Sequence, residues 1–342
     1  MCRTDRMLNS DIKAKIAMFC NVGADAVITA KDVNCIYEVP LLFHQEGLDT
    51  KIVELLNIWT RAPRLENWET LCRQMNDPAY EVTIAIVGKY VDLTESYKSL
   101  NEALIHGGIP SRARVNLKFV DSETIDANTC NLSLEGVDGV LVPGGFGSRG
   151  VEGKICAARY ARENQIPYFG ICLGMQIAVI EFARSLAGLD RANSTEFDPS
   201  TPHPVIYLME EWFDDKSGTI QKRDIHSDKG GTMRLGAYPC RLEKDTVAYR
   251  AYGKEAIAER HRHRFEFNNA YMEQLKKAGL KISGIAPSGE LVEIVEIENH
   301  PWFLGCQFHP EFKSRPMTPH PLFRSFIAAA LKYSGNREIE KK

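Results

Sequence analysis

The sequence lacks any long apolar run and any strong charge bias. No stretch approaches the roughly 18 apolar residues of a membrane-spanning helix. The net charge is only −3 and the basic residues are spread along the chain, which argues against a dedicated nucleic-acid surface. The first residues have no apolar core before a small-residue cleavage site, so they do not read as a secretory signal. We therefore expect a cytoplasmic protein that binds neither membranes nor nucleic acid.

A regular cysteine framework is also missing. The nine cysteines are an odd number at irregular spacings, which favours reduced thiols over a set of disulfides. Most of them, such as Cys20, Cys130, Cys156 and Cys306, lie in apolar stretches and are expected to be small core residues. Cys172 is the exception, because it stands between two glycines in the stretch GICLGMQ.

Short apolar runs alternate with amphipathic stretches from residue 81 onward. This alternation is typical of a parallel sheet with helices on both faces. From about residue 203 the sequence is richer in strand patterns, and we expect antiparallel strands there. The predicted strands of the alternating part are 82–87, 115–120, 139–142 and 166–171, and its predicted helices are 96–107, 152–164 and 175–186.

The stretch GICLGMQ places Cys172 at a predicted strand-to-helix turn. A nucleophile stands clear of its own backbone at such a turn only if the flanking positions are nearly free of side chains, as Gly170 and Gly174 are. A thiol also needs a neighbouring base and a carboxylate that orients the base. His309 and Glu311, in the stretch FHPEF, supply both. An isolated HPE triplet is weak evidence, but paired with Cys172 it favours a nucleophilic triad.

The glycine-rich stretch PGGFGSRG has two interpretations. Acyl transfer needs donors for the oxyanion, and the backbone N–H groups of Gly145 and Leu173 are candidates. The stretch also matches the dinucleotide pattern G-x-G-x-x-G. However, the acidic ribose ligand expected about 20 residues later is replaced by Gly170 and Cys172, so we disfavour a dinucleotide site.

In the stretch ERHRHRFEF, arginine residues alternate with histidine residues. In a strand, His261 and His263 would share one face, but no further ligand pattern completes a metal site. We interpret the stretch as a polar strand lining a cleft, with its arginines, Arg264 among them, on the opposite face. One of these arginines could bind a substrate carboxylate bidentately. Glu196, in NSTEF, is a plausible acceptor for an ammonium group.

The stretches PGGFGSRG, GICLGMQ and FHPEF, in this order and spacing, resemble class I (triad) glutamine amidotransferases. Over essentially the whole chain the sequence resembles the CTP synthase family, with similar stretches KAKIAMFCNV, AVITAKDVNCIYEVP, VGKYVDLTESYKSLNEAL, KGGTMRLGA and ERHRHRFE. The resemblance implies a flavodoxin-like, open, mostly parallel α/β glutaminase domain at 81–335. It would be preceded by the tail of a P-loop-type α/β synthetase domain at 1–58 and a linker at 59–80, and followed by a polar tail at 336–342.

The resemblance implies roles for individual residues of the glutaminase domain. Cys172 would be the nucleophile, His309 the general base and Glu311 the group that orients the base. The residues implied to contact L-glutamine are Gly145, Leu173, Gly174, Met175 and Gln176, with Glu196 at its ammonium group and Arg264 at its carboxylate.

The family uses ammonia from glutamine to aminate C4 of UTP after ATP phosphorylates that position. Full-length members use Mg²⁺ and ATP, bind UTP, CTP and GTP, and are expected to form homotetramers. The glutaminase domain itself is expected to bind no cofactor and no metal. The nucleotide contacts that the resemblance implies are Lys15 with Arg3 nearby for the pyrimidine nucleotide, and Lys31, Asp32 and Val33 beside the ATP adenine.

The sequence lacks several features of the synthetase domain of this family. It contains no G-x-x-x-x-G-K-[ST] motif and no UTP segment of the KTKPTQ type, and the Mg²⁺-binding carboxylates of the family have no counterpart. We therefore expect an N-terminally truncated chain that retains glutamine hydrolysis through a thioester on Cys172 but cannot by itself aminate UTP. Two alternatives stay open: a related triad hydrolase of another γ-glutamyl or peptide substrate, and a non-catalytic assembly or regulatory module in oligomers.

Overall fold

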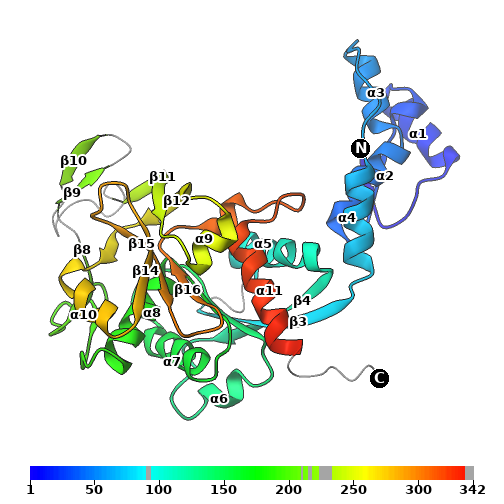
Figure 1. Cartoon of the computed structure of the whole chain (residues 1–342). Helices are drawn as coiled ribbons and strands as arrows, with labels where there is room; N and C mark the ends of the chain where they lie inside the picture. Colours follow the sequence, from blue (N-terminus) through cyan, green and yellow to red (C-terminus); the bar gives the residue numbers. More distant parts are fainter. Residues whose placement is uncertain (90–93, 209–210, 215–217, 223–232, 336–342) are drawn as a thin grey trace. The chain divides into compact units, whose positions relative to one another are not determined.

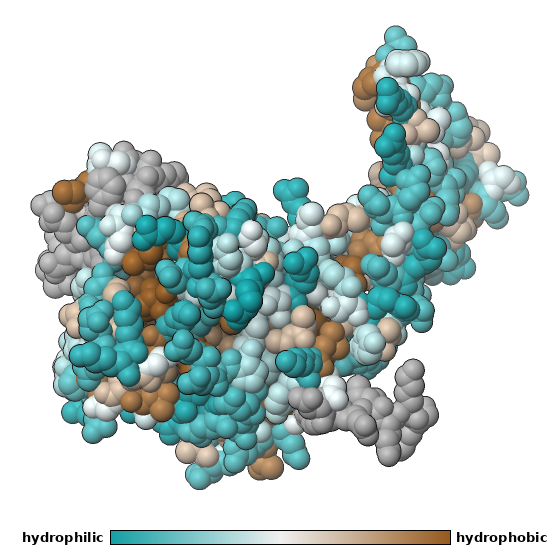
Figure 2. Space-filling model, viewed as in Figure 1, coloured by the Kyte–Doolittle hydropathy of each residue, from teal (hydrophilic) through white to brown (hydrophobic). Residues whose placement is uncertain are grey.

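The computed structural model describes residues 1–89, 94–208, 211–214, 218–222 and 233–335. Contacts between residues divide the chain into two compact units, Met1–Pro78 and Ala79–Lys342 (Figure 1). Within the described ranges, none of the helices is both long enough and apolar enough to cross a membrane. The surface in view in Figure 2 is mostly hydrophilic, with hydrophobic residues in scattered patches.

The first unit combines a small parallel sheet with short helices. Its elements are β1 (Cys2–Thr4), α1 (Ser10–Cys20), η1 (Ala24–Ala26), β2 (Thr29–Lys31), η2 (Ile36–Glu38), α2 (Val39–Gln45), α3 (Leu48–Leu55) and α4 (Glu66–Asn76). β1 pairs with β2 in parallel. Glu46 links three of these elements, because its Oε2 accepts from Lys13 Nζ at 2.6 Å and from the Thr29 N–H at 2.9 Å. Polar contacts of this kind supplement a small buried core.

α3 (Leu48–Leu55) ends at a left-handed asparagine although apolar residues continue beyond it. Asn57 takes a left-handed backbone conformation, with φ of 51°. The Ile58 N–H then donates to the Val53 carbonyl at 2.9 Å, which closes the helix end in a Schellman arrangement. α3 therefore stops at Leu55, since asparagine adopts this conformation more readily than most residues.

The predicted linker at 59–80 contains a helix that packs on the first unit. α4 buries Leu71 and Cys72, and the ring of Trp68 lies 6.2 Å from that of Tyr37. The amphipathic sequence of α4 is the feature of the predicted linker that indicates a helix. The wider division of the chain into functional domains stays a prediction.

The core positions expected for four cysteines are confirmed only in part. Cys130 and Cys306 are buried and Cys156 is half-buried. Cys20 is exposed, against expectation. It ends α1, a helix in which Ala17 is the one buried residue, so its apolar neighbours face solvent.

The second unit is built on one nine-stranded sheet. Across the sheet its strands are β12 (Ala256–His263), β11 (Arg234–Leu242), β14 (Leu280–Ile285), β15 (Val292–Ile297), β16 (Phe303–Cys306), β6 (Tyr168–Ile171), β5 (Gly139–Val142), β3 (Tyr80–Gly88) and β4 (Ala113–Asp121). From β16 to β4 neighbouring strands are parallel, in the flavodoxin-like order. From β16 to β12 they are antiparallel. The expected α/β fold is confirmed, and β16 joins its two halves.

Helices cover both faces of this sheet (Figure 1). The main ones are α5 (Lys98–Gly108), α7 (Val151–Glu163), α8 (Leu173–Ser185) and α11 (Pro321–Gly335). Alternate residues of β3 separate the two layers of the core. Ala85 and Val87 pack with α7 and α8, whereas Ile84 and Ile86 pack with α5 and α11. A strand buried on both faces is expected to read as a nearly continuous apolar run, as β3 does.

Smaller elements complete the second unit. A second sheet has the order β13 (Phe265–Phe267), β8 (Pro204–Leu208) and β7 (Asn193–Ser194), and β9 (Glu211–Asp214) pairs with β10 (Thr219–Lys222). The remaining helices and turns are η3 (Thr94–Tyr97), η4 (Ile109–Ser111), α6 (Cys130–Ser133), α9 (Val247–Tyr252), η5 (Asn269–Tyr271), α10 (Met272–Lys277) and η6 (Pro310–Lys313).

Three parallel strands end at the same edge of the main sheet. Val142 at the end of β5 lies opposite Gly170, and Ile171 at the end of β6 lies opposite Cys306 at the end of β16. The residues that follow these strands include the three stretches singled out in the sequence. Parallel pairing therefore brings them together, as expected for the ligand-binding edge of such sheets.

Replacing Gly170 by alanine is expected to destabilise the second unit. A Cβ at this position would lie 2.4 Å from the Gly174 carbonyl oxygen, which belongs to the backbone and cannot turn away. We expect Gly170→Ala to lower the free energy of unfolding by about 1–3 kcal/mol in urea denaturation, as overpacking does. The matched control is Gly335→Ala, whose Cβ would meet nothing within 4 Å. Equal stability of the two variants would contradict this account.

Candidate active site at the edge of the parallel strands

Cys172 lies at the turn between β6 and α8 in a strained backbone conformation. Its φ of 52° and ψ of −101° are rare for a residue other than glycine. The Cys172 N–H donates to the Cys306 carbonyl at 2.7 Å, and the Cys172 carbonyl accepts from the N–H groups of Met175 and Gln176 at 3.1 and 3.3 Å. These bonds fix the turn from both sides.

The glycines that flank Cys172 are required by close backbone contacts. A Cβ on Gly174 would lie 2.1 Å from the Val142 carbonyl oxygen, and one on Gly170 would lie 2.4 Å from the Gly174 carbonyl oxygen. The sharp strand-to-helix turn predicted from GICLGMQ is therefore confirmed.

The loop after β5 lies against two members of the predicted triad, Cys172 and His309. A Cβ on Gly144 would lie 2.8 Å from His309 Cε1 and 3.6 Å from Cys172 Cβ, so only glycine fits here without a shift. A Cβ on the next residue, Gly145, would lie 3.3 Å from Leu173 Cδ2. The Leu173 side chain thus packs next to Gly145, and oxyanion binding by the two backbone N–H groups stays a prediction. Leu173, Gly174, Met175 and Gln176 form the buried start of α8.

His309 and Glu311 are in contact, as predicted. His309 Nδ1 and Glu311 Oε1 lie 2.8 Å apart. The contact is made by a tight turn, because η6 begins directly after His309 and brings the carboxylate back toward the ring. Pro310 occupies the first position of that turn, where its fixed φ is favourable. The His309 N–H donates to the Arg260 carbonyl at 2.7 Å and ties the turn to β12.

The His309 ring binds its proton tightly. Burial lowers the pKa of His309, but attraction and a hydrogen bond to Cys172, followed by the same two effects from Glu311, outweigh burial and raise it to about 10. The ring therefore holds a proton at neutral pH. This proton faces the Cys172 sulfur, which together with Glu311 is what holds it.

A cavity of about 310 Å³ lies over Cys172. Its wall includes Gly145, His309 and Glu311, and also Arg262, whose guanidinium lies 5.9 Å from the centre of the Phe146 ring. The volume is at the lower end of the range of ligand sites and suits a small molecule.

Neither Glu196 nor Arg264, the predicted contacts of the substrate ammonium and carboxylate groups, lines that cavity. Glu196 Oε1 accepts the Gly147 N–H at 2.8 Å. Burial raises the pKa of Glu196, while the Gly147 hydrogen bond and the charges of Arg264 and Lys89 act in the opposite direction. The charge of Arg264 thus acts on Glu196, and the predicted roles of both residues at the substrate stay predictions.

The alternation expected in ERHRHRFEF is confirmed for β12 but not beyond it. Along β12, His261 and His263 are buried, and Arg260 and Arg262 are exposed. Arg264 was expected on the face of the other arginines, but the strand ends at His263, so the alternation does not reach Arg264 and its face stays a prediction. No group of three or more metal-ligating side chains occurs in the part of the chain that the structure describes.

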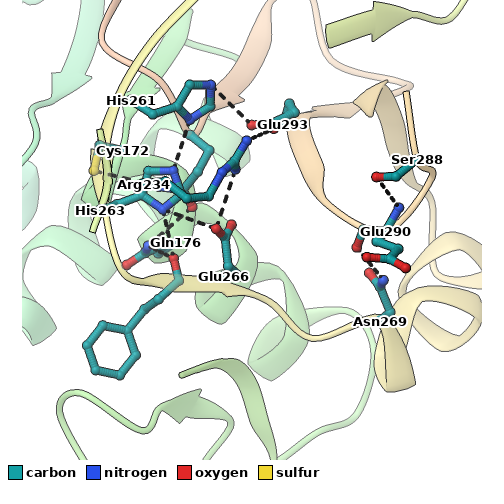
Figure 3. A network of polar contacts seen from close by, with 12 residues as sticks. Cys172, Gln176, Arg234, His261, His263, Glu266, Asn269, Ser288, Glu290 and Glu293 are labelled. Carbon is teal, nitrogen blue, oxygen red and sulfur yellow. Dashed lines mark hydrogen bonds and ion pairs between the residues drawn. The ribbon is translucent and has the colours of Figure 1, made fainter. Parts of the chain in front are cut away.

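Two buried amides lie behind Cys172, and one of them was missed in the sequence. Gln307 Nε2 donates to Cys172 Sγ at 3.6 Å, and Gln307 Oε1 accepts from Gln176 Nε2 at 3.2 Å. Gln176 Nε2 also donates to the Phe265 carbonyl at 3.1 Å (Figure 3). Gln307 is the residue that was missed, and only its position directly before the FHPEF stretch could have indicated its role.

The predicted nucleotide contacts all lie in the first unit. Arg3 on β1 forms an ion pair with Asp32, which follows Lys31 at the end of β2. Val33 comes next and is half-buried. Lys15 is exposed on α1, a different element. The structure therefore gathers Arg3, Lys31 and Asp32 at one end of the small sheet, and nucleotide binding by these residues stays a prediction.

Comparison with known proteins gives two family matches. Residues 92–329 match the model of the glutamine amidotransferase class-I family, and residues 1–58 match that of the CTP synthase N-terminus. The CTP synthase of Syntrophus aciditrophicus is 62% identical over 98% of this chain and 61% of its own length. That of Oleidesulfovibrio alaskensis is 62% identical over 100% of this chain and 62% of its own length.

A solved structure agrees with these matches. The glutaminase domain of Trypanosoma brucei CTPS, with bound acivicin, is 42% identical with a TM-score of 0.66, over 73% of this chain and 94% of that chain. The expectation of an N-terminally truncated chain is corrected by the match at 1–58, because synthetase-domain sequence is present there. The chain spans about 61% of the length of the curated relatives that it matches.

The tightly held proton of His309 predicts a pH-dependent contribution to stability. The pKa of His309 is raised from 6.5 to about 10, so the folded state binds this proton more tightly than the unfolded state does. The contribution is present below 6.5 and is lost as the pH rises through about 10. We expect the parent to exceed His309→Gln in free energy of unfolding at about pH 7 by at least about 1 kcal/mol more than it does at about pH 11. A difference that grows with pH in urea denaturation would contradict this assignment.

Proposed function

Because the chain belongs to the CTP synthase family of class-I glutamine amidotransferases, we propose that its second unit hydrolyses L-glutamine to glutamate and ammonia. One observation carries the proposal. Cys172 is held in a strained turn and lines a 310 Å³ cavity that His309 also lines, and the His309 ring contacts Glu311 at 2.8 Å. A nucleophile, a proton carrier and the group that orients the carrier are the parts that acyl transfer through a thioester requires.

The first half of the reaction breaks the amide bond. Cys172 Sγ attacks the side-chain amide carbon of glutamine, so a C–S bond forms and the carbonyl oxygen becomes negative. His309 holds a proton at neutral pH because its pKa is about 10, and it gives that proton to the leaving nitrogen. The C–N bond breaks, ammonia leaves, and a γ-glutamyl thioester remains on Cys172.

The second half of the reaction releases glutamate. Water attacks the thioester carbon, and the now neutral His309 ring takes one of its protons. The C–S bond breaks, glutamate leaves, and the thiolate–imidazolium pair is restored. Glu311 keeps the ring in place and favours its protonated form throughout.

The negative oxygen formed in both halves would be bound by backbone N–H groups. Leu173 is the first residue of α8, and the first N–H groups of a helix have no partner within the helix. Gly145, on the loop after β5, packs against the Leu173 side chain and offers a second N–H. Both groups come from rigid backbone, which suits an oxyanion site.

The amino-acid end of glutamine would be held by charged groups. Glu196 would accept the ammonium group, since a carboxylate that accepts one backbone N–H has further acceptor capacity. Arg264 would bind the carboxylate bidentately. The start of α8 from Leu173 to Gln176 would contact the remainder of the substrate.

In the complete family reaction, this ammonia would aminate UTP at the expense of ATP. Mg²⁺ and ATP supply the phosphorylation chemistry in that reaction. The described residues of this chain offer no cluster of three metal ligands, so we assign it no metal-dependent step. We propose that the chain by itself carries only the glutaminase half-reaction, and that the first unit contributes nucleotide contacts to a complete enzyme.

An assembly role is the second candidate for the first unit. Its exposed apolar side chains include Phe19 and Trp59, with exposed fractions of 83% and 94%. Protein–protein interfaces are marked by contiguous apolar patches, and we propose these two side chains as candidate members of such a patch. This role is compatible with glutaminase activity in the second unit.

Ammonia release from glutamine tests the proposed function. We expect the purified chain to release ammonia and Cys172→Ala to lose at least about a thousandfold in rate, as nucleophile deletions do. Cys20→Ala changes a cysteine that is exposed in the first unit and should keep the parent rate. Equal ammonia release by parent and Cys172→Ala would exclude the thioester route.

The proposed contact between Arg264 and the substrate carboxylate predicts an effect on glutamine binding rather than on the chemical step. Arg264→Lys keeps the charge but loses the bidentate geometry, so we expect the KM for L-glutamine to rise about tenfold with little change in kcat. Arg250→Lys, at an exposed position on α9, is the matched control. An unchanged KM in steady-state assays of Arg264→Lys would remove Arg264 from the site.

A further inference from the structure

We propose that Gln307 is a positioning residue that holds the Cys172 sulfur as a thiolate through one N–H···S hydrogen bond, and that Gln176 sets the direction of this bond. The proposal rests on the proposed glutaminase function, because it takes Cys172 as the nucleophile. Its support is geometric, however, and its test needs no glutamine turnover.

The orientation of both amides follows from one backbone group. The Phe265 carbonyl can only accept, so the Gln176 side chain must turn its nitrogen toward it, at 3.1 Å. The second N–H of the same nitrogen is directed at Gln307 Oε1, at 3.2 Å. Gln307 therefore presents its own nitrogen to Cys172 Sγ, at 3.6 Å. The reverse orientation would set the N–H groups of the two amides against each other.

The side chains that form this hydrogen bond are buried. The exposed fraction is 0% for Gln307 and 3% for both Gln176 and Cys172. In such a site a donor acts on a charged acceptor with little screening, so the bond favours thiolate over thiol. Burial without the donor would have the opposite effect, because it disfavours the charged form.

The backbone holds donor and acceptor in register. The Gln307 N–H donates to the Glu293 carbonyl of β15 at 2.8 Å, and the Cys172 N–H donates to the Cys306 carbonyl at the end of β16 at 2.7 Å. Both partners are thus anchored to the sheet rather than to a loop. This rigidity suits a role in aiming the sulfur.

Gln307 and His309 would both act as donors toward the Cys172 sulfur, but for different parts of the reaction. The His309 proton leaves with ammonia during the proposed reaction, whereas an amide N–H of Gln307 is not acidic and stays in place. Gln307 would therefore be the constant donor to the sulfur over the whole cycle. Both N–H groups of Gln176 are used within the protein, so its side chain can meet the substrate only through Oε1.

The test is the pH profile of Cys172 alkylation by iodoacetamide, read from the mass of the peptide that carries Cys172. Gln307→Met keeps the length of the side chain and removes the donor. We expect the midpoint of the profile to rise by about one unit, with about tenfold slower alkylation below it. Gln307→Glu places acceptor oxygens against the sulfur and should shift the midpoint further.

A matched control separates this effect from general loss of an amide. Gln274→Met removes an amide whose Nε2 donates to the Ala187 carbonyl at 3.0 Å, on the exposed side of α10. It should leave the alkylation profile of the parent unchanged. A folded Gln307→Met variant, checked by circular dichroism, with the parent profile would overturn the proposal.

If Gln307→Met does not fold, Gln176→Met tests the same proposal one bond further away. Loss of the Gln176 donor frees the Gln307 amide to turn, so we expect a smaller shift in the same direction, and an unchanged profile would overturn the proposal. Failure of the proposed function looks different. A parent that releases no ammonia from glutamine counts against the function, while the alkylation profile still decides the role of Gln307.

Discussion

The left-handed backbone of Cys172 is the constraint on which the site depends. A φ of 52° at a non-glycine residue persists only where the surroundings fix it. Here the bond to Cys306 holds it from one side and the first turn of α8 from the other. The close contact of Gly170 and Gly174 then allows β6, β16 and α8 to meet at one point. The parallel order of the sheet follows as a requirement of the site, because only parallel neighbours end at the same edge.

The chemistry of the site depends on charge held by burial and paired groups. Burial by itself lowers the pKa of His309, yet Cys172 and Glu311 raise the pKa of its ring to about 10. The sulfur faces a mobile proton on His309 and a fixed N–H on Gln307. In the proposed reaction, His309 would then act as acid and base, while Gln307 would keep the Cys172 sulfur aimed. The antiparallel half of the sheet contributes to this, because β15 anchors Gln307.

Local patterns in the sequence predicted the parts of the site that depend on local geometry. The strained turn at Cys172 follows from its flanking glycines, and the pairing of His309 with Glu311 was predicted from their closeness in the sequence, although not the turn that brings them into contact. Contacts that depend on register or on turn type were not predictable in this way. The tight turn at Pro310 and the end of β12 before Arg264 are of this kind. So is Gln307, whose partner Gln176 lies 131 residues away in the chain.

The central claim is that Cys172 carries the acyl group during glutamine hydrolysis. The most direct measurement is acid quenching of the protein during turnover, followed by mass analysis of its cysteine peptides. The account predicts a γ-glutamyl adduct on the peptide with Cys172 and no adduct on the peptides of the other cysteines. Turnover without such an adduct under conditions that stabilise thioesters, or an adduct on another cysteine, would contradict it.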